Sequence, residues 1–200
     1  RPSAREPVMT ARAGLGHNGG PTMEAGVVWR THAWRAAQKA LMPNAIPKLV
    51  LQMRIKRAGE LGMDYKTYAR VRQISGQDVT GLLFSSNALR LLRDARLPGR
   101  EAELLEAVKG ASRLALVHRP LLPETVAEVN PVLDATGPAP VFTEGWSAIR
   151  ERVQSVMRAR GLPGASVVVI GDAPLEHEWS AAGRAAAYLT AAEYFGTAAR

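Results

Sequence analysis

Polar side chains that could carry out chemistry follow short apolar runs at four places from residue 85 onward. They are Ser85, Ser86 and Asn87, then His118 and Arg119, then Glu144, then Asp172 with His177 close behind. A guanidinium such as that of Arg119 can clamp a phosphate or a carboxylate through paired hydrogen bonds. An imidazole can transfer protons near neutral pH when a carboxylate orients it. These residues therefore predict a site for an anionic, phosphorylated or carboxylated ligand.

The roles in such a site divide by residue type. His118 or His177 would act as acid or base and Asp172 would orient it, so these three are the candidate catalytic residues. The candidate ligand-binding residues are Ser85, Ser86, Asn87, Arg119 and Glu144.

A purely structural interpretation of the same residues stays open. Ser86, Asn87 and Asp172 have side chains that commonly cap helices. Arg119 could pair with a nearby carboxylate instead of a ligand. Polar caps of this kind occur at strand-to-helix loops whether or not a protein has an activity.

Glu176, His177 and Glu178 have side chains of the kinds that bind metal ions. Consecutive residues of a helix point about 100° apart, so these three would not converge on one ion. We therefore predict an exposed charged segment here. The sequence contains no phosphate-binding loop, nucleophile elbow or zinc-binding helix motif, and we predict no metal and no cofactor.

A basic helical hairpin is predicted ahead of these segments. Apolar spacing indicates one helix over residues 47–61 and a second over residues 65–74. Ala58, Gly62 and Val71 resemble the small, turn and buried positions of the helix-turn-helix motif, over about twenty residues. The resemblance implies that the second helix reads nucleic acid. Its candidate contacts are Lys66, Thr67, Arg70 and Arg72. Simple packing of two helices is the alternative, because a strand and not a third helix is expected next.

From residue 78 onward, short apolar runs alternate with helical patterns. Strands are expected over residues 79–84, 113–117, 140–142 and 165–170. Helices are expected over residues 87–93, 100–109, 124–133, 144–160 and 174–195. This alternation predicts an α/β fold, a small parallel sheet with flanking helices. The carboxyl ends of all strands would then share one edge, where ligands bind in such sheets.

The last two of these helices carry the clearest apolar stripes. The inward residues are expected to be Trp146, Ile149, Val153 and Val156 in the first, and Trp179, Ala182, Ala186 and Leu189 in the second. Both helices are therefore predicted to pack against the sheet.

The beginning of the chain has a different composition. Residues 1–26 mix Gly, Pro and Arg without periodicity, which is typical of a flexible arm. Residues 27–42 are expected to form an amphipathic helix. The predicted organisation is a flexible basic arm over residues 1–26, a basic helical segment over 27–75 and an α/β domain over 76–200.

Positive charge is concentrated in the first half of the chain. Residues 1–100 hold 17 Lys and Arg against 6 Asp and Glu, whereas residues 101–200 hold 9 against 12. A localised positive field attracts polyanions such as nucleic acid. We expect such contact through residues 48–72, with a solvated basic surface without a partner as the alternative.

The overall composition, with 46% hydrophobic and 22% charged residues, is that of a folded domain. No apolar stretch reaches the roughly 20 residues that a membrane helix needs, so no membrane span is predicted. The chain has no Cys, which excludes disulfides, thiolate nucleophiles and Cys-based zinc sites. A cytoplasmic location is the expectation.

Three functions stay open at this point. The first is a cytosolic binding or regulatory protein whose basic helical half contacts nucleic acid and whose α/β half binds a small ligand or partner. The second is a small α/β enzyme that acts on an anionic substrate at the sheet edge. The third is a structural interaction protein without activity.

Overall fold

The centre of the protein is a parallel β-sheet. The computed structural model describes residues 46–91 and 94–197, and within them the sheet has five strands. The strands are β1 (Gly81–Ser85), β2 (Ser112–Val117), β3 (Ala135–Pro138), β4 (Val167–Gly171) and β5 (Ala187–Thr190). Every neighbouring pair is parallel, in the order β3-β2-β1-β4-β5. The predicted α/β fold with a small parallel sheet is confirmed, with one strand more than expected.

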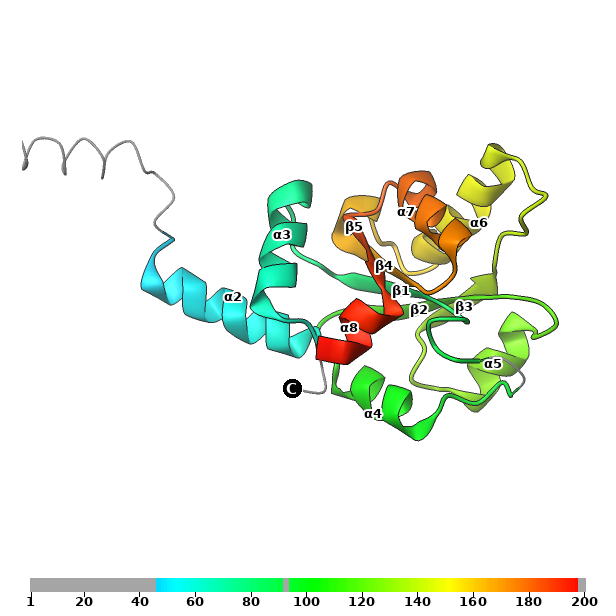
Figure 1. The fold of residues 1–200 in the computed structure, drawn as a ribbon, viewed down its shortest axis with the longest axis horizontal. Helices are drawn as coiled ribbons and strands as arrows, with labels where there is room; N and C mark the ends of the chain where they lie inside the picture. The colour runs from blue at the N-terminus through cyan, green and yellow to red at the C-terminus, as the bar shows by residue number, and fades with distance from the viewer. Residues whose placement is uncertain (1–45, 92–93, 198–200) are drawn as a thin grey trace, which may run out of the picture. The chain divides into compact units, whose positions relative to one another are not determined.

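Helices cover both faces of the sheet (Figure 1). They are α4 (Gly99–Ala107), α5 (Pro123–Val129) and α8 (Ala191–Thr197) on one face, and α6 (Trp146–Arg158) and α7 (Glu178–Gly183) on the other. Side chains alternate between the faces along each strand, so Leu82 and Phe84 pack on the first face and Leu83 packs on the second. The result is a three-layer α/β/α arrangement with a hydrophobic core on each side of the sheet.

The strand order reverses at β1, which pairs with both β2 and β4. The connection after β1 passes through α4 on one face, whereas the connection after β4 passes through α7 on the opposite face. Loops that diverge in this way leave a crevice beyond the carboxyl ends of the strands, and ligands bind there in doubly wound sheets.

Helices α2 (Lys48–Glu60) and α3 (Tyr65–Ser75) form the predicted hairpin. The Asp64 side chain caps α3 by accepting a hydrogen bond from the backbone N–H of Thr67. Tyr68 and Val71 are buried in the same cluster as Leu82. The hairpin therefore packs on the core of the first sheet face.

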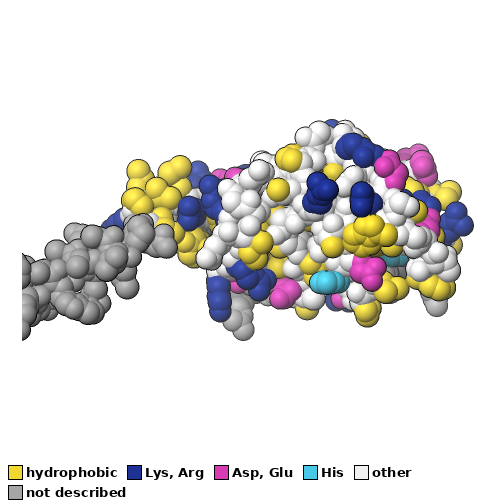
Figure 2. Space-filling view, turned by 90° about the horizontal axis from the view of Figure 1, so that it is seen from above, with side chains coloured by type: hydrophobic (Ala, Val, Ile, Leu, Met, Phe, Trp, Pro, Cys, Tyr) yellow, Lys and Arg dark blue, Asp and Glu magenta, His cyan; other side chains and the backbone are white. Residues whose placement is uncertain are grey.

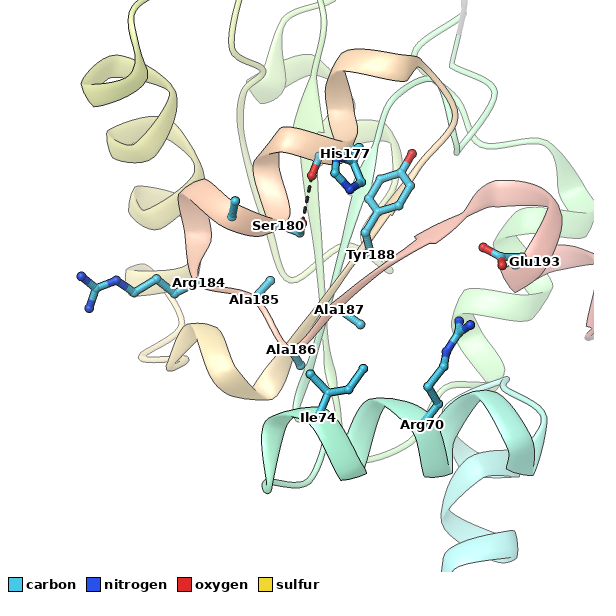
Figure 3. A pocket seen from close by; sticks show the side chains of 11 residues that line it. Arg70, Ile74, His177, Ser180, Arg184, Ala185, Ala186, Ala187, Tyr188 and Glu193 are labelled. Carbon is cyan, nitrogen blue, oxygen red and sulfur yellow. Dashed lines mark hydrogen bonds between the residues drawn. The ribbon is translucent and has the colours of Figure 1, made fainter.

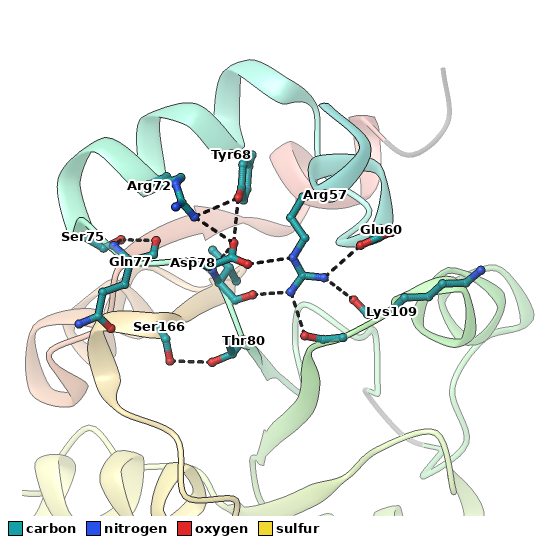
Figure 4. Close-up of polar contacts among 12 residues, drawn as sticks. Arg57, Glu60, Tyr68, Arg72, Ser75, Gln77, Asp78, Thr80, Lys109 and Ser166 are labelled. Atoms are coloured by element: carbon teal, nitrogen blue, oxygen red, sulfur yellow. Dashed lines mark hydrogen bonds and ion pairs between the residues drawn. The ribbon is translucent and has the colours of Figure 1, made fainter. Parts of the chain in front are cut away.

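Arg57 of α2 fastens the hairpin to the amino-terminal edge of the sheet (Figure 4). Its guanidinium donates hydrogen bonds to Asp78 Oδ2 at 3.1 Å and to the carbonyl oxygens of Val79 and Gly110 at 2.8 Å each. The Tyr68 hydroxyl donates to Asp78 Oδ1 at 2.8 Å. Burial alone would raise the pKa of Asp78, but Tyr68 and Arg57 together lower it. Asp78 is thus a structural anion that joins α2, α3 and the sheet.

The predicted strand over residues 140–142 is wrong, because the third strand lies at Ala135–Pro138. This segment has little β-propensity, and Pro138 is tolerated because β3 is an edge strand. Residues 139–145 form a loop beyond the carboxyl end of β3. The apolar residues Val141 and Phe142 are therefore free to line a cavity.

The predicted single helix over residues 174–195 is also wrong. This segment forms a 3₁₀ turn, η2 (Pro174–His177), followed by α7, β5 and α8. Helix α7 ends at Gly183, and a Cβ on Gly183 would lie 2.8 Å from side-chain atoms of Val153 and Met157 on α6. Pairing of β5 with β4 outweighs the helix propensity of the alanine-rich sequence.

Two smaller predictions also differ from the structure. Residues 86–90 form turns, not the start of the helix predicted over residues 87–93, and residues 92–93 lie outside the described part. Trp146 begins α6 and is 46% exposed, so its predicted inward position is wrong. Val153 and Val156 of the same helix are buried as predicted, and so is Trp179 of α7.

The predicted arm over residues 1–26 and the predicted helix over residues 27–42 lie outside the described residues. Among the helices of the described part, none has the length and apolar character needed to cross a membrane.

Candidate functional site

A cavity of about 490 Å³ opens at the carboxyl-terminal edge of the sheet, and we call it the switch-point cavity. The loops after β1, β2, β3 and β4 all contribute to it, together with α6 and α7. The lining residues are Asn87, His118, Pro140, Val141, Phe142, Ile149, Ala173, Pro174, Leu175, Glu176, Glu178 and Trp179. Its volume falls in the range of small-molecule sites in proteins.

His118 is held at the cavity by Ser86. The backbone N–H of His118 donates to Ser86 Oγ at 3.0 Å, and Ser86 Oγ also lies 3.0 Å from His118 Nδ1. In the tautomer that carries its proton on Nε2, the serine hydroxyl donates to Nδ1. Nε2 lies 3.5 Å from Glu176 Oε1, so its N–H faces a carboxylate.

Glu176 is the centre of this polar network. Its Oε1 accepts a hydrogen bond from Asn87 Nδ2 at 2.7 Å. Its Oε2 accepts from the backbone N–H groups of Asp172 at 2.7 Å and Ala173 at 3.1 Å. The side chain is only 2% exposed, so these donors replace the water that a carboxylate needs. Glu176 thereby ties the loops after β1, β2 and β4 together.

Burial lowers the pKa of His118, and the nearby carboxylate of Glu176 offsets only part of this effect. The imidazole ring also stacks on Trp179, with ring centroids 5.5 Å apart and planes 24° apart. His118 is therefore a neutral, immobilised ring at neutral pH, with both nitrogens directed at Ser86 and Glu176.

One wall of the cavity is apolar and partly exposed. Phe142 is 83% exposed and Leu175 is 57% exposed, although both are large hydrophobic residues. Ile149 of α6 contributes a half-buried side chain to the same wall. Exposed apolar side chains around a concave site are typical of a ligand-binding surface.

The predicted ligand-binding residues lie in different parts of the structure and make different contacts. Ser86 and Asn87 belong to the cavity network, whereas the buried Ser85 accepts a hydrogen bond from the backbone N–H of Ala88. Glu144 accepts hydrogen bonds from Arg152 Nε at 2.9 and 2.8 Å and from the Val141 backbone N–H at 3.2 Å. The bond to Arg152 is the main reason that the pKa of Glu144 is lowered.

Arg119 is exposed and does not line the switch-point cavity, although its charge is felt by Glu144. Asp172 is exposed and lines a smaller neighbouring hollow with Arg90. The predicted combination of an Arg119 clamp with Asp172 as orienter is therefore not assembled around His118.

His177 lies at a different place, a groove of about 850 Å³ between α3, α7 and β5 (Figure 3). Its ring meets Tyr188 edge to face at 5.4 Å, and its carbonyl oxygen accepts a hydrogen bond from Ser180 Oγ. Arg70 enters the same groove from α3. His118 and His177 thus line separate hollows.

The predicted nucleic-acid contacts differ in their exposure to solvent and in their ion pairs. Lys66 and Arg70 are exposed, Thr67 is half-buried, and Arg72 lies 3.5 Å from Asp78 in an ion pair. Arg72 therefore serves the Asp78 network of the hairpin.

Sequence reasoning missed Glu176, Trp179 and the apolar wall as parts of a site. The prediction that Glu176 lies in an exposed charged segment is wrong, because it is 1% exposed. The signal that could have revealed it is the glutamate four residues after Asp172, at a distance that lets the side chain bond back to the start of the turn.

Within the described residues, no group of three or more His, Asp or Glu side chains is arranged to hold a metal ion. No protein-family model, no curated protein and no solved structure matches this chain.

Proposed function

We propose that this protein binds a small, largely apolar organic molecule in the switch-point cavity. One observation carries the proposal: at the reversal of strand order, one cavity is lined both by apolar side chains and by a polar network of His118, Asn87 and the buried Glu176. Clefts with apolar walls and a few placed polar groups are the usual form of small-molecule sites. Their position beyond the strand ends is the one that doubly wound sheets use.

Binding is favoured over catalysis by how the polar groups are engaged. Ser86 is 1% exposed and does not line the cavity, so it is not placed as a nucleophile. Both nitrogens of His118 face partners within the protein. The network therefore holds the shape of the cavity and forms the polar part of its lining.

Fluorescence of the neutral naphthalene dye prodan tests the proposal. The dye should bind the full chain with one site. Ala173→Trp places an indole in the cavity and should abolish binding. Ala181→Trp adds the same group to the separate groove and is the matched control. Equal binding by both variants would contradict the proposed site.

A second candidate function is nucleic-acid binding by the hairpin. The observation in its favour is that Lys66 and Arg70 are exposed one turn apart on α3, so they share a face. Lys48 and Lys56 are exposed on α2. Phosphate contacts by such side chains are independent of the cavity, and the same protein could bind both partners.

A further inference from the structure

The charges around the switch-point cavity indicate which class of ligand it takes, an inference that rests on the proposed function. Glu176 and Glu178 both line the cavity, whereas none of its lining residues in the described part is Lys or Arg. Figure 2 shows a face on which histidine and acidic side chains lie beside hydrophobic ones, with Lys and Arg side chains elsewhere on the same face. The lining thus carries negative charge without a basic counterpart.

The hydrogen bonds of Glu176 do not cancel its charge. Its partners are an amide, two backbone N–H groups and a neutral imidazole, all of which supply dipoles and no net positive charge. Because the side chain is buried, water screens this charge poorly. A negatively charged ligand group would be repelled at the cavity floor, and a positively charged one would be attracted.

The aromatic rings of the cavity lining also favour a positively charged ligand. Trp179 and Phe142 line the cavity. His118 stacks on Trp179, whereas the largely exposed ring of Phe142 is open to an organic cation, which the faces of such rings attract. Phe142 is largely exposed and can approach a ligand without a change in the core. Glu178 is exposed at the rim, where it would add to the attraction.

We infer that the switch-point cavity binds an organic cation, a primary amine with an aromatic or aliphatic body. The apolar body lies against Phe142, Leu175 and Ile149. The ammonium group faces Glu176 and Glu178. This class differs from the anionic ligand that the sequence alone suggests, because Arg119 is not among the residues that line the cavity.

Three naphthalene probes of one size and different charge test the inference. They are 2-naphthylmethylamine, 2-naphthylmethanol and 2-naphthoate, each used to displace prodan from the full chain at neutral pH. The amine should bind at least about tenfold more tightly than the carboxylate, with the alcohol between them.

Two variants show whether the preference for the amine comes from a carboxylate at the cavity or from the charge of the protein as a whole. Glu178→Gln, at an exposed cavity position, should reduce the amine preference by about threefold or more. Glu128→Gln, exposed on α5 on the other face of the sheet, should leave the preference unchanged. Binding of all three probes with equal affinity would overturn the charge inference but retain the proposed site. Absence of prodan binding by the wild-type chain would overturn the proposed site and the charge inference with it.

Discussion

At the scale of single residues, Glu176 shows why the centre of the site escapes prediction. The sequence predicts a regular helix over residues 174–195, and on a helix Glu176, His177 and Glu178 diverge into solvent. The segment is instead a 3₁₀ turn, and the carboxylate bonds to Asn87 and lies beside His118, which come from distant parts of the chain. Contacts between residues so far apart in the sequence depend on the order of the strands in the sheet. A single sequence does not specify this order.

Glu176→Gln should lower the free energy of unfolding by about 1–3 kcal/mol. The amide has one oxygen in place of two, so its NH₂ group would meet either backbone donors or the Asn87 amide. Urea unfolding measures the change. Glu178→Gln, at an exposed position, should stay within about 0.5 kcal/mol. An equally small effect of Glu176→Gln would contradict a bonding role for the carboxylate.

The lowered pKa of His118 gives stability a defined pH dependence. The unfolded chain binds a proton at about pH 6.5, whereas the folded chain binds it only at lower pH, so stability rises with pH over this interval. His118 thus contributes stability that is complete above about pH 6.5 and is lost as the pH falls through the lowered pKa.

Urea unfolding of the wild type and of His118→Gln between about pH 8 and 5 measures this contribution. The wild type should lose stability below about pH 6.5, and the variant should lose less. The carboxyl groups with lowered pKa values, Asp78, Asp134 and Glu144, act at more acidic pH and do not interfere. Parallel curves for the two proteins would count against a half-buried neutral imidazole at His118.

At the scale of elements, strands with strong apolar character could be predicted and weak ones could not. β1 and β4 are buried on both faces and read as continuous apolar runs. β3 and β5 are short edge strands with compositions of Ala-Thr-Gly-Pro and Ala-Tyr-Leu-Thr. Their β-conformation comes from pairing with β2 and β4, so local propensity does not reveal it.

The link between α7 and β5 depends on a close approach to Gly164, in the 3₁₀ turn η1 (Gly164–Ser166). A Cβ on Gly164 would lie 2.2 Å from the carbonyl oxygen of Gly183 and 2.7 Å from that of Arg184. Gly164→Ala should therefore destabilise the protein by about 2 kcal/mol or more, because backbone atoms must move.

Gly145→Ala is the matched control, since a Cβ at Gly145 meets nothing within 4 Å. Its effect on thermal unfolding should be within about 1 kcal/mol. If the two substitutions had the same effect, the close packing of α7 and β5 against η1 would be wrong.

At the scale of the whole molecule, the formal net charge of +8 favours contact with polyanions. Glu176 and Glu178, the acidic residues that line the switch-point cavity, lie in residues 101–200, where acidic residues outnumber basic ones. Charge distribution thus allows separate sites for a polyanion and for a small cation. The overall charge could be predicted from composition, but the local sign at the cavity required the fold.

If the hairpin binds nucleic acid, the affinity of the protein for duplex DNA should fall as the salt concentration rises. The double variant Lys66→Ala and Arg70→Ala should lower the slope of log affinity against log salt by about 1.8, about 0.9 for each lost phosphate contact. The substitution Arg72→Ala belongs in a separate variant, because its loss would disturb Asp78. If the wild-type chain failed to retain DNA at low salt, the hairpin would not be a nucleic-acid site.

The most direct test of the switch-point cavity is a nuclear magnetic resonance titration of ¹⁵N-labelled full chain with 2-naphthylmethylamine. Saturable amide shifts should be concentrated at Asn87, His118, Phe142 and Leu175, which line the cavity. Saturable shifts concentrated instead at Arg70, Ile74 and Tyr188 would place binding in the groove beside β5 and contradict ligand binding in the switch-point cavity.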